Sequence, residues 1–431
     1  MISVQNHQQR LSGNKLLVAL SMLLAMGACS PKTTGVLRAP GHVGGQTGQT
    51  QDDNKVLSST EVAAEKERKE AEAMLEKRRN HNGIALVLPF QLDKLDPNNL
   101  SKNDVTRSSL ALDFYQGFQL GLDEVAKRSK SFVLDVIDSR DDENYNGIIA
   151  KSADVVNASL VVGPVYPKEI RAFGANLNDK AVLQVNPLAA SNPTDYNIPN
   201  LVTLTPSLSI HTRAVAQKMA RDYKSGDIIF IYNTTDADGK QFLAGFAAEV
   251  RKTNPSAKLQ SVNNVTQLND ALSNVGNNLI AIGTTDKNEL RNFLNNLDKK
   301  EKEGFYSFKI FGHPLWDKID FSAYENFEHF RPTISSENHI KSWTVAVKNF
   351  KDSYYTAYGV NPSDHSYKGY DVARYFGSLL NKYGPEYAKH LSKETFDGLF
   401  SSYQFEKNNN AGYINNAVSF KEYKGTSFQL N

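Results

Sequence analysis

Eight side chains that can hydrogen-bond to or stack on a small molecule follow short apolar runs of the sequence. They are Tyr166, Ser191, Asn192, Asn233, Asp236, Asp238, His313 and Trp316. Hydroxyl, amide, carboxylate and imidazole groups bind polar ligand atoms, and aromatic rings pack on flat ones. If the runs are parallel strands, these residues share the sheet edge at which open α/β sheets bind ligands. We therefore predict a ligand-binding site here.

Several of these residues also have a purely structural explanation. Tyr166 could be a packing aromatic, and Ser191 a turn residue. Asp238 precedes Gly239, and Asp is common in turns for local reasons. Trp316 could belong to the core instead of forming a ligand platform. The sequence leaves these alternatives open.

Motifs for catalysis or cofactor binding are missing. The sequence has no Walker loop, Rossmann glycine fingerprint, His-Glu-x-x-His motif or Gly-x-Ser-x-Gly elbow. Its nine histidines are scattered, with no paired metal-ligand spacing. A Ser-His-Asp triad assembles in space, so its sequence spacing carries no signal. We expect no enzymatic activity, no metal and no cofactor.

Cys29, the only cysteine, follows a short apolar segment. Residues 16–26 are mostly apolar and come after Arg10 and Lys15. The segment is too short to cross a bilayer core of roughly 30 Å and has the flanks of a signal peptide. Its end resembles a bacterial lipobox, with Met26 in place of the usual Leu. We predict a signal peptide over 1–28 and lipidation of Cys29; an incidental thiol is the alternative.

The segment after Cys29 lacks the pattern of a folded domain. Residues 29–57 show no apolar period, which predicts a flexible tether. Ser58 and Glu61 fit a capping box, and residues 58–80 are mostly Glu, Lys, Arg and Ala. We predict a charged helical spacer there; a partner-binding helix is the alternative. Ser30 directly after the cysteine indicates the outer membrane rather than the inner, and hence a periplasmic location.

From residue 82 the sequence alternates between expected strands and helices. Strands are predicted at 84–89, 132–137, 160–162, 181–185, 201–204, 227–232, 258–262, 278–283 and 308–311. Helices are predicted at 109–127, 145–156, 168–177, 209–223, 240–252, 287–297, 342–358 and 366–383, with a hairpin over 399–430 turning at 408–412. The pattern predicts an α/β fold with doubly wound parallel sheets. Net charge is +2, from 49 basic and 47 acidic residues, so we expect no nucleic-acid partner.

Five segments, in order, resemble type I periplasmic binding proteins, the class that includes branched-chain amino-acid receptors. They are residues 84–89, 113–118 (Asp-Phe-Tyr-Gln-Gly-Phe), 161–165 (Val-Val-Gly-Pro-Val), 186–193 (Asn-Pro-Leu-Ala-Ala-Ser-Asn-Pro) and 369–373 (Gly-Tyr-Asp-Val-Ala). The resemblance implies two doubly wound parallel-sheet lobes joined by three crossovers, near 205–209, 331–335 and 399–403. Lobe 1 would be 82–205 plus 334–398, and lobe 2 would be 206–333 plus 399–431.

The features that bind amino acids in that class are absent at two positions. Amino-acid receptors of the class hold the ligand carboxylate with a serine near the position of Pro167, which lacks even a backbone N–H. They place the acid that pairs with the ammonium near His313 and Trp316, and Asp317 is one or two positions off. A Trp with nearby His, Tyr and Asn better suits a sugar, peptide or other neutral ligand. It also suits a protein-docking surface.

Two functions therefore remain open. The first is a lipid-anchored receptor that captures a small solute, not a typical branched-chain amino acid, for transport through a permease or for sensing, by closing its lobes. The second is an interaction lipoprotein of the cell envelope, similar to penicillin-binding-protein activators that dock onto a peptidoglycan synthase. The long tether favours the second, because it lets an outer-membrane protein reach across the periplasm.

Overall fold

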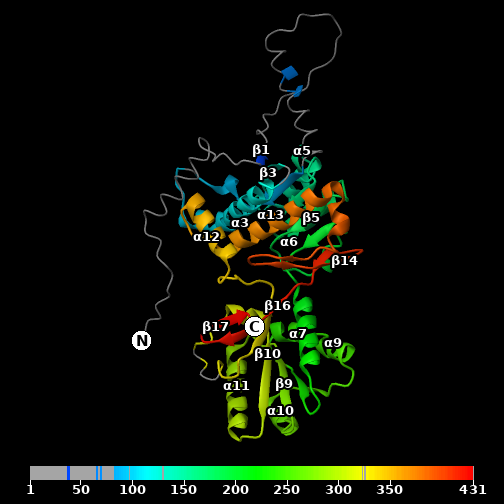
Figure 1. The fold of residues 1–431 in the computed structure, drawn as a ribbon, viewed down its shortest axis with the longest axis vertical. Helices are drawn as coiled ribbons and strands as arrows, with labels where there is room; N and C mark the ends of the chain where they lie inside the picture. The colour runs from blue at the N-terminus through cyan, green and yellow to red at the C-terminus, as the bar shows by residue number, and fades with distance from the viewer. Residues whose placement is uncertain are drawn as a thin grey trace, which may run out of the picture.

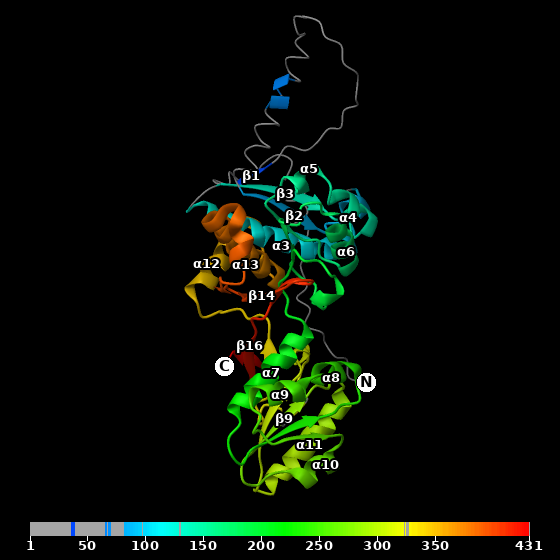
Figure 2. The same ribbon diagram turned by 90° about the vertical axis from the view of Figure 1, so that its right-hand side faces the viewer.

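The chain folds into two lobes, each a mainly parallel sheet with helices on both faces (Figures 1 and 2). The computed structural model describes residues 36–38, 65–66, 68–69, 82–96, 98–128, 131–322, 324 and 327–430. Cys29, the expected signal peptide and most of the expected tether and spacer lie outside these residues. No described helix combines the length and the apolar composition that crossing a membrane requires.

Lobe 1 has an eight-stranded sheet in the order β1-β3-β2-β4-β5-β6-β15-β14, parallel except at β14–β15. Its strands are β1 (Val36–Arg38), β2 (Gly83–Leu88), β3 (Phe132–Asp138), β4 (Leu160–Val162), β5 (Leu183–Asn186), β6 (Leu201–Thr203), β14 (Phe405–Asn408) and β15 (Gly412–Asn415). On one face Ile84 and Leu86 pack beneath α3 (Lys102–Ala126) and α13 (Asp364–Tyr383). On the other, Ala85 and Val87 contact the side of α4 (Glu143–Ile149), α5 (Ala153–Val156) and α6 (Pro167–Asn176). Burial on both faces explains the uninterrupted apolar run of β2.

Lobe 2 has a seven-stranded sheet in the order β17-β16-β11-β10-β9-β7-β8. Its strands are β7 (Ile228–Tyr232), β8 (Leu259–Val262), β9 (Asn277–Ile282), β10 (Ser307–Gly312), β11 (Thr333–Ser336), β16 (Ser419–Lys424) and β17 (Ser427–Leu430). One face packs on α7 (Leu208–Asp222), α8 (Ala237–Leu243) and α9 (Phe246–Thr253). The other packs on α10 (Val265–Ala271), α11 (Lys287–Lys302) and a cluster around Trp316. The doubly wound α/β prediction is confirmed.

Helices α3 and α13 pack with backbone touching backbone. A Cβ atom on Gly117 of α3 would overlap the carbonyl of Ser366, and one on Gly369 of α13 would overlap the carbonyl of Phe114. Both glycines lie in segments whose sequence resembled the binding-protein class. Their function here is to hold the start of α13 rigidly against lobe 1.

The crossovers lie at 204–207, 337–344 and 416–418, between β6 and α7, β11 and α12 (Val345–Tyr358), and β15 and β16. The second and third predicted positions were wrong. Residues 331–335 fall at β11, which pairs with β10 inside lobe 2. The expected hairpin turns as predicted, but β15 pairs with β6, so the chain stays in lobe 1 until Asn415. Lobe 1 therefore comprises β1 (36–38), 82–203 and 345–415, and lobe 2 comprises 208–336 and 419–430.

Other element predictions also differ from the structure. The predicted helix 145–156 divides into α4 and α5. Helix α3 begins at Lys102, seven residues earlier than predicted, because Ser101 and Asp104 form a capping box. The predicted helix 240–252 divides into α8 and α9 because Gly245 has a left-handed backbone (φ 76°). Within the expected tether, Val36–Arg38 forms β1 beside β3. Residues 65, 66, 68 and 69 of the expected spacer are helical.

Short segments complete the fold. They are the 3-10 helices η1 (Leu92–Lys94), η2 (Pro193–Asp195), η3 (Pro314–Lys318) and η4 (Gly384–His390), and the paired strands β12 (Phe396–Asp397) and β13 (Ser402–Tyr403). Of these, η3 matters most for the site, because it follows β10 on the side of lobe 2 that faces lobe 1.

Candidate ligand-binding site

A cavity of about 460 Å³ opens between the lobes, at the carboxyl ends of β4 and β5. Most of its wall belongs to lobe 1, the second crossover adds two residues, and lobe 2 adds one, Lys318. The lining residues are Leu110, Val165, Tyr166, Pro167, Leu188, Ala189, Ala190, Ser191, Lys318, Glu337, Asn338, Asp364, His365, Lys368 and Phe400. Its volume is within the range of small-molecule sites, about 300–1,000 Å³. We call this cavity the interlobe pocket.

One side of the interlobe pocket is mainly apolar. It is formed by Leu110 of α3 and by the loops that follow β4 and β5. The Asn186 side chain fixes the second loop, since its Nδ2 donates to the Ala189 carbonyl and its Oδ1 accepts from the Ala189 N–H, both at 2.9 Å. This side can therefore contact the apolar part of a ligand without rearranging.

The other side carries charge, and its most buried charged group is Lys368, with 7% of its surface exposed. The Lys368 Nζ donates to the Thr205 hydroxyl at 2.8 Å and lies 3.9 Å from a Glu337 carboxylate oxygen. Thr205 belongs to the first crossover and Glu337 to the second. Lys368 therefore connects the pocket wall to two of the three segments that join the lobes.

The start of α6, where the class would bind a ligand carboxylate, is occupied by the carboxylate of Glu169. That buried side chain accepts the Tyr166 N–H at 3.1 Å and an Asn146 side-chain N–H at 3.0 Å. Burial raises the pKa of Glu169 above its ordinary value. Pro167, which follows Tyr166, has no backbone N–H to donate to a ligand. A ligand carboxylate placed here would meet a protein carboxylate instead of free donors.

Of the eight predicted residues, Tyr166 and Ser191 line the interlobe pocket and the other six do not. Asn192 caps η2, accepting from Thr194. Asn233 is exposed and donates to Asn263 at 2.8 Å. Asp236 caps α8, and Asp238 accepts a hydrogen bond from the Thr285 hydroxyl at 2.9 Å. The last three lie on lobe 2 just after β7.

His313 and Trp316 are buried, with 2% and 0% of their surfaces exposed, so the prediction that they contact ligand was wrong. The Trp316 Nε1–H donates to the Thr284 carbonyl at 2.8 Å, and the indole packs edge-on against Phe321 and Phe327. Its ring lies where a Cβ on Gly312 would be, so a glycine at the strand end lets the chain fold back into the core. His313 accepts the Leu315 N–H at 3.0 Å, and burial lowers its pKa to about 4.

Sequence reasoning missed the charged side of the interlobe pocket. The residues concerned are Lys318, Glu337, Asn338, Asp364, His365 and Lys368. Placing the second crossover a few residues too early hid Glu337 and Asn338. Lys368 directly precedes Gly369, the first residue of the segment 369–373 that resembled the class. This position was the one signal in the sequence that could have pointed to Lys368.

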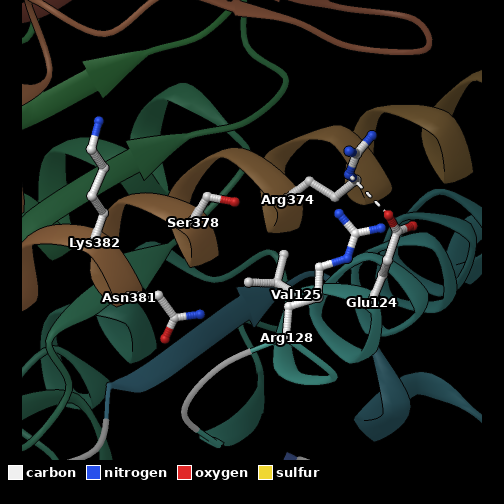
Figure 3. Close-up of a pocket in the computed structure, with 7 residues that line it drawn as sticks. All are labelled: Glu124, Val125, Arg128, Arg374, Ser378, Asn381 and Lys382. Atoms are coloured by element: carbon white, nitrogen blue, oxygen red, sulfur yellow. Dashed lines mark ion pairs between the residues drawn. The ribbon is translucent and has the colours of Figure 1, made fainter.

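A second hollow, of about 300 Å³, lies in lobe 1 between the carboxyl-terminal parts of α3 and α13 (Figure 3). Arg374 pairs with Glu124 there at 3.7 Å, and Lys382 pairs at 2.7 Å with Glu394, outside the hollow. Both cations therefore already have a carboxylate partner within the protein. None of the described residues of lobe 2 lines this hollow, so closing the lobes would not enclose a ligand there.

No protein-family model and no curated protein matches this chain. Solved structures do match, each over 81% of the chain. One is a candidate branched-chain amino acid ABC transporter protein from Rhodospirillum rubrum, at 15% identity, 100% coverage of that chain and a TM-score of 0.58. Another is an ABC-type branched-chain amino acid transporter from Rhodopseudomonas palustris, at 14%, 95% and 0.55. A third, an ABC transporter substrate-binding protein from Desulfitobacterium hafniense, gives 17%, 99% and 0.50. The chain has the type I periplasmic binding protein fold.

Proposed function

We propose that this protein is a solute receptor that holds one small ligand in the interlobe pocket and closes its lobes on it, for transport or sensing. The observation that carries the proposal is the pocket itself, which lies at the strand ends where open α/β sheets bind ligands. Lys318 reaches the same pocket from the other lobe, so a ligand there would contact both lobes. Hinge closure follows when a ligand binds the closed form better than the open one.

We infer that the ligand is uncharged overall, with an apolar part and several hydroxyl or amide groups. Lys368 and Glu337 already face each other, so neither leaves a free charge for a ligand. The other two charges of the lining, Lys318 and Asp364, are exposed and opposite in sign, so the ammonium and carboxylate charges of the pocket cancel. Tyr166, Ser191 and Asn338 offer neutral hydrogen-bonding groups next to the apolar side. A buried ligand charge without a partner would cost several kcal/mol. Small sugars, nucleosides and muropeptide-like amides fit this description.

A thermal-shift screen of the full-length protein in detergent tests the proposal. Amino acids, sugars, nucleosides and muropeptides would be added separately. A bound neutral compound at 100 times its Kd stabilises the fold by about 2.7 kcal/mol. Ala190→Trp, which fills the interlobe pocket, should abolish the shift, and Ser256→Trp, at an exposed position of lobe 2, should not. A shift that survives in Ala190→Trp would refute the proposed site.

We further propose that lipid on Cys29 anchors the protein to a membrane, the outer one in preference to the inner, with the lobes in the periplasm. The support is the sequence of residues 10–30 alone. Several acyl chains hold a protein far more firmly than one. The residues between Cys29 and the lobes would then set how far the pocket lies from the membrane.

A second candidate function is docking to an envelope protein such as a peptidoglycan synthase. The observation in its favour is an apolar patch at the start of α12, where Trp343 is 69% and Val345 73% exposed. Exposed Trp side chains are frequent at the centre of protein interfaces. A photo-crosslinker at position 343 in living cells should capture a synthase if docking occurs. Labelling no greater than that of a crosslinker at exposed Tyr355 would exclude docking at this patch.

A further inference from the structure

Lys318 and Asp364 belong to different lobes and line the same interlobe pocket. Lys318 ends η3 in lobe 2, and Asp364 begins α13 in lobe 1. Both side chains are exposed. Within the described part of the chain neither takes part in an ion pair, whereas the other lysine of the pocket, Lys368, faces Glu337. Two opposite charges therefore face one opening without being joined.

The segment that carries Lys318 is held rigidly. Trp316 is buried in the core beneath it, and the His313 ring caps its first turn. Asp317 forms an ion pair with the buried Lys421 of β16 at 2.7 Å. The residues first expected to touch ligand thus have a different effect: they fix the direction in which Lys318 leaves lobe 2.

The segment that carries Asp364 is also rigid. Ser363 caps α13, and the glycine contacts with α3 hold its first turns in place. Asp371, fully buried two turns later, accepts the N–H groups of Leu399, Phe400 and Ser401 at 2.8–2.9 Å. The backbone is therefore held at both positions, and a change in the separation of the Lys318 and Asp364 Cα atoms requires the lobes to move.

The positive charge of Lys318 already acts on the first turn of α13. Burial is the main reason that the pKa of His365 lies below its ordinary value, and the charges of Lys368 and Lys318 lower it further. Asp364 and Asp113 act in the opposite direction. Lys318 is thus close enough across the open pocket for its field to reach the residue next to Asp364.

We propose that Lys318 and Asp364 form an ion pair when the lobes close, and so act as an electrostatic latch across the interlobe pocket. The inference extends the proposed solute-binding function, since it assigns these two charges to lobe closure and not to the ligand. An exposed ion pair changes an equilibrium by about two- to fivefold. The latch should therefore raise the fraction of closed molecules only modestly, and a bound ligand would still be needed for most molecules to close.

Thiol crosslinking without any ligand tests whether the two residues approach each other. Full-length protein with Cys29→Ser, Lys318→Cys and Asp364→Cys would be treated with a short bismaleimide, about as long as the two replaced side chains together, and run on a gel. A direct disulfide needs Cα atoms within about 7 Å, closer than a Lys–Asp ion pair requires, so the crosslinker is the reagent that matches the latch. The matched control replaces Asp364→Cys by Asp195→Cys, an exposed lobe 1 position outside the pocket. A yield no higher than the control would overturn the latch.

A charge swap tests whether the attraction matters. Spin labels at exposed Lys151 in lobe 1 and Lys240 in lobe 2 report the interlobe distance in the ligand-free protein. Lys318→Asp or Asp364→Lys alone should reduce the closed population about two- to fivefold, and the double variant should recover it. A double variant as open as the single ones would overturn the latch. If crosslinking and rescue succeed while the compound screen yields no ligand, the latch stands and the solute-binding proposal falls.

Discussion

The Lys368 ammonium donates a hydrogen bond to the Thr205 hydroxyl at 2.8 Å, joining the wall of the interlobe pocket to the first crossover. Glu337 of the second crossover lies 3.9 Å from the same ammonium. One side chain thus lines the interlobe pocket and contacts two of the three connections between the lobes. A ligand that displaced or strengthened these contacts would act directly on the hinge.

Replacing Lys368 with Met should destabilise the protein by about 1–3 kcal/mol, because Glu337 loses its counter-charge and Thr205 its donor. The check is the free energy of unfolding from urea titration. Lys348→Met is the matched control, since Lys348 is exposed on α12. Equal stability of the two variants would show that Lys368 does not brace the crossovers.

His313 should make the protein less stable in acid. Burial lowers its pKa to about 4, whereas an unfolded His titrates near 6.5. The unfolded state therefore binds a proton first, so the stability contributed by neutral His313 is complete above pH 6.5 and is lost as pH falls towards 4. The loss should amount to about 2–3 kcal/mol.

His313→Asn should flatten the fall in stability between pH 6.5 and 4, because the Asn oxygen can still accept the Leu315 N–H. The free energy of unfolding, obtained from urea titrations at a series of pH values, measures this fall in stability. His390→Asn, which changes a histidine that stacks on Tyr383 at the end of η4, is the control. If the free energy of unfolding of wild type and His313→Asn changed identically with pH, His313 would not be the cause of the loss of stability in acid.

Cys29→Ala should release the protein from the membrane fraction, since the predicted lipid attaches at that thiol. Fractionation of cells followed by detection of the protein in soluble and membrane pools measures it. Retention of the variant in the membrane pool would contradict the lipoprotein prediction.

Leu, Ile and Val should not bind tightly. The Glu169 carboxylate occupies the start of α6, and the buried His313 stands near the position where amino-acid receptors of the class place the acid that pairs with the ligand ammonium. Misplacing either end of a zwitterion costs several kcal/mol, about as much as the whole binding energy of a millimolar ligand. Calorimetry that gave a Kd below about 10 μM for any of the three would show that this assignment of the pocket is wrong.

The sequence predicted the layers of the fold better than the connections between them. Apolar runs such as residues 84–88 are buried on both faces of a parallel sheet and are recognisable without a structure. The third crossover was misplaced because a hairpin has the same local pattern in either lobe. The pairing of β15 with β6, in which Tyr413 lies opposite Val202 and Ile414 opposite Thr203, assigns it to lobe 1.

The lining of the interlobe pocket was predicted in part, for a related reason. Tyr166 and Ser191 follow strands β4 and β5 directly, so position along the chain was enough to place them at the pocket. Trp316 also follows a strand, but its ring packs into the core, in the space that is free because Gly312 has no side chain. Lys318, Glu337 and Lys368 come together from three distant segments, and no local pattern predicts such a meeting.

Calorimetric titration of the best neutral compound from the screen into wild type and Ala190→Trp tests the central claim most directly. We predict saturable one-to-one binding to wild type and at least about 100-fold weaker binding to Ala190→Trp, because the indole would fill the apolar side of the interlobe pocket. Ser256→Trp should bind like wild type. Equal affinity of wild type and Ala190→Trp would contradict the claim that the ligand lies between the lobes.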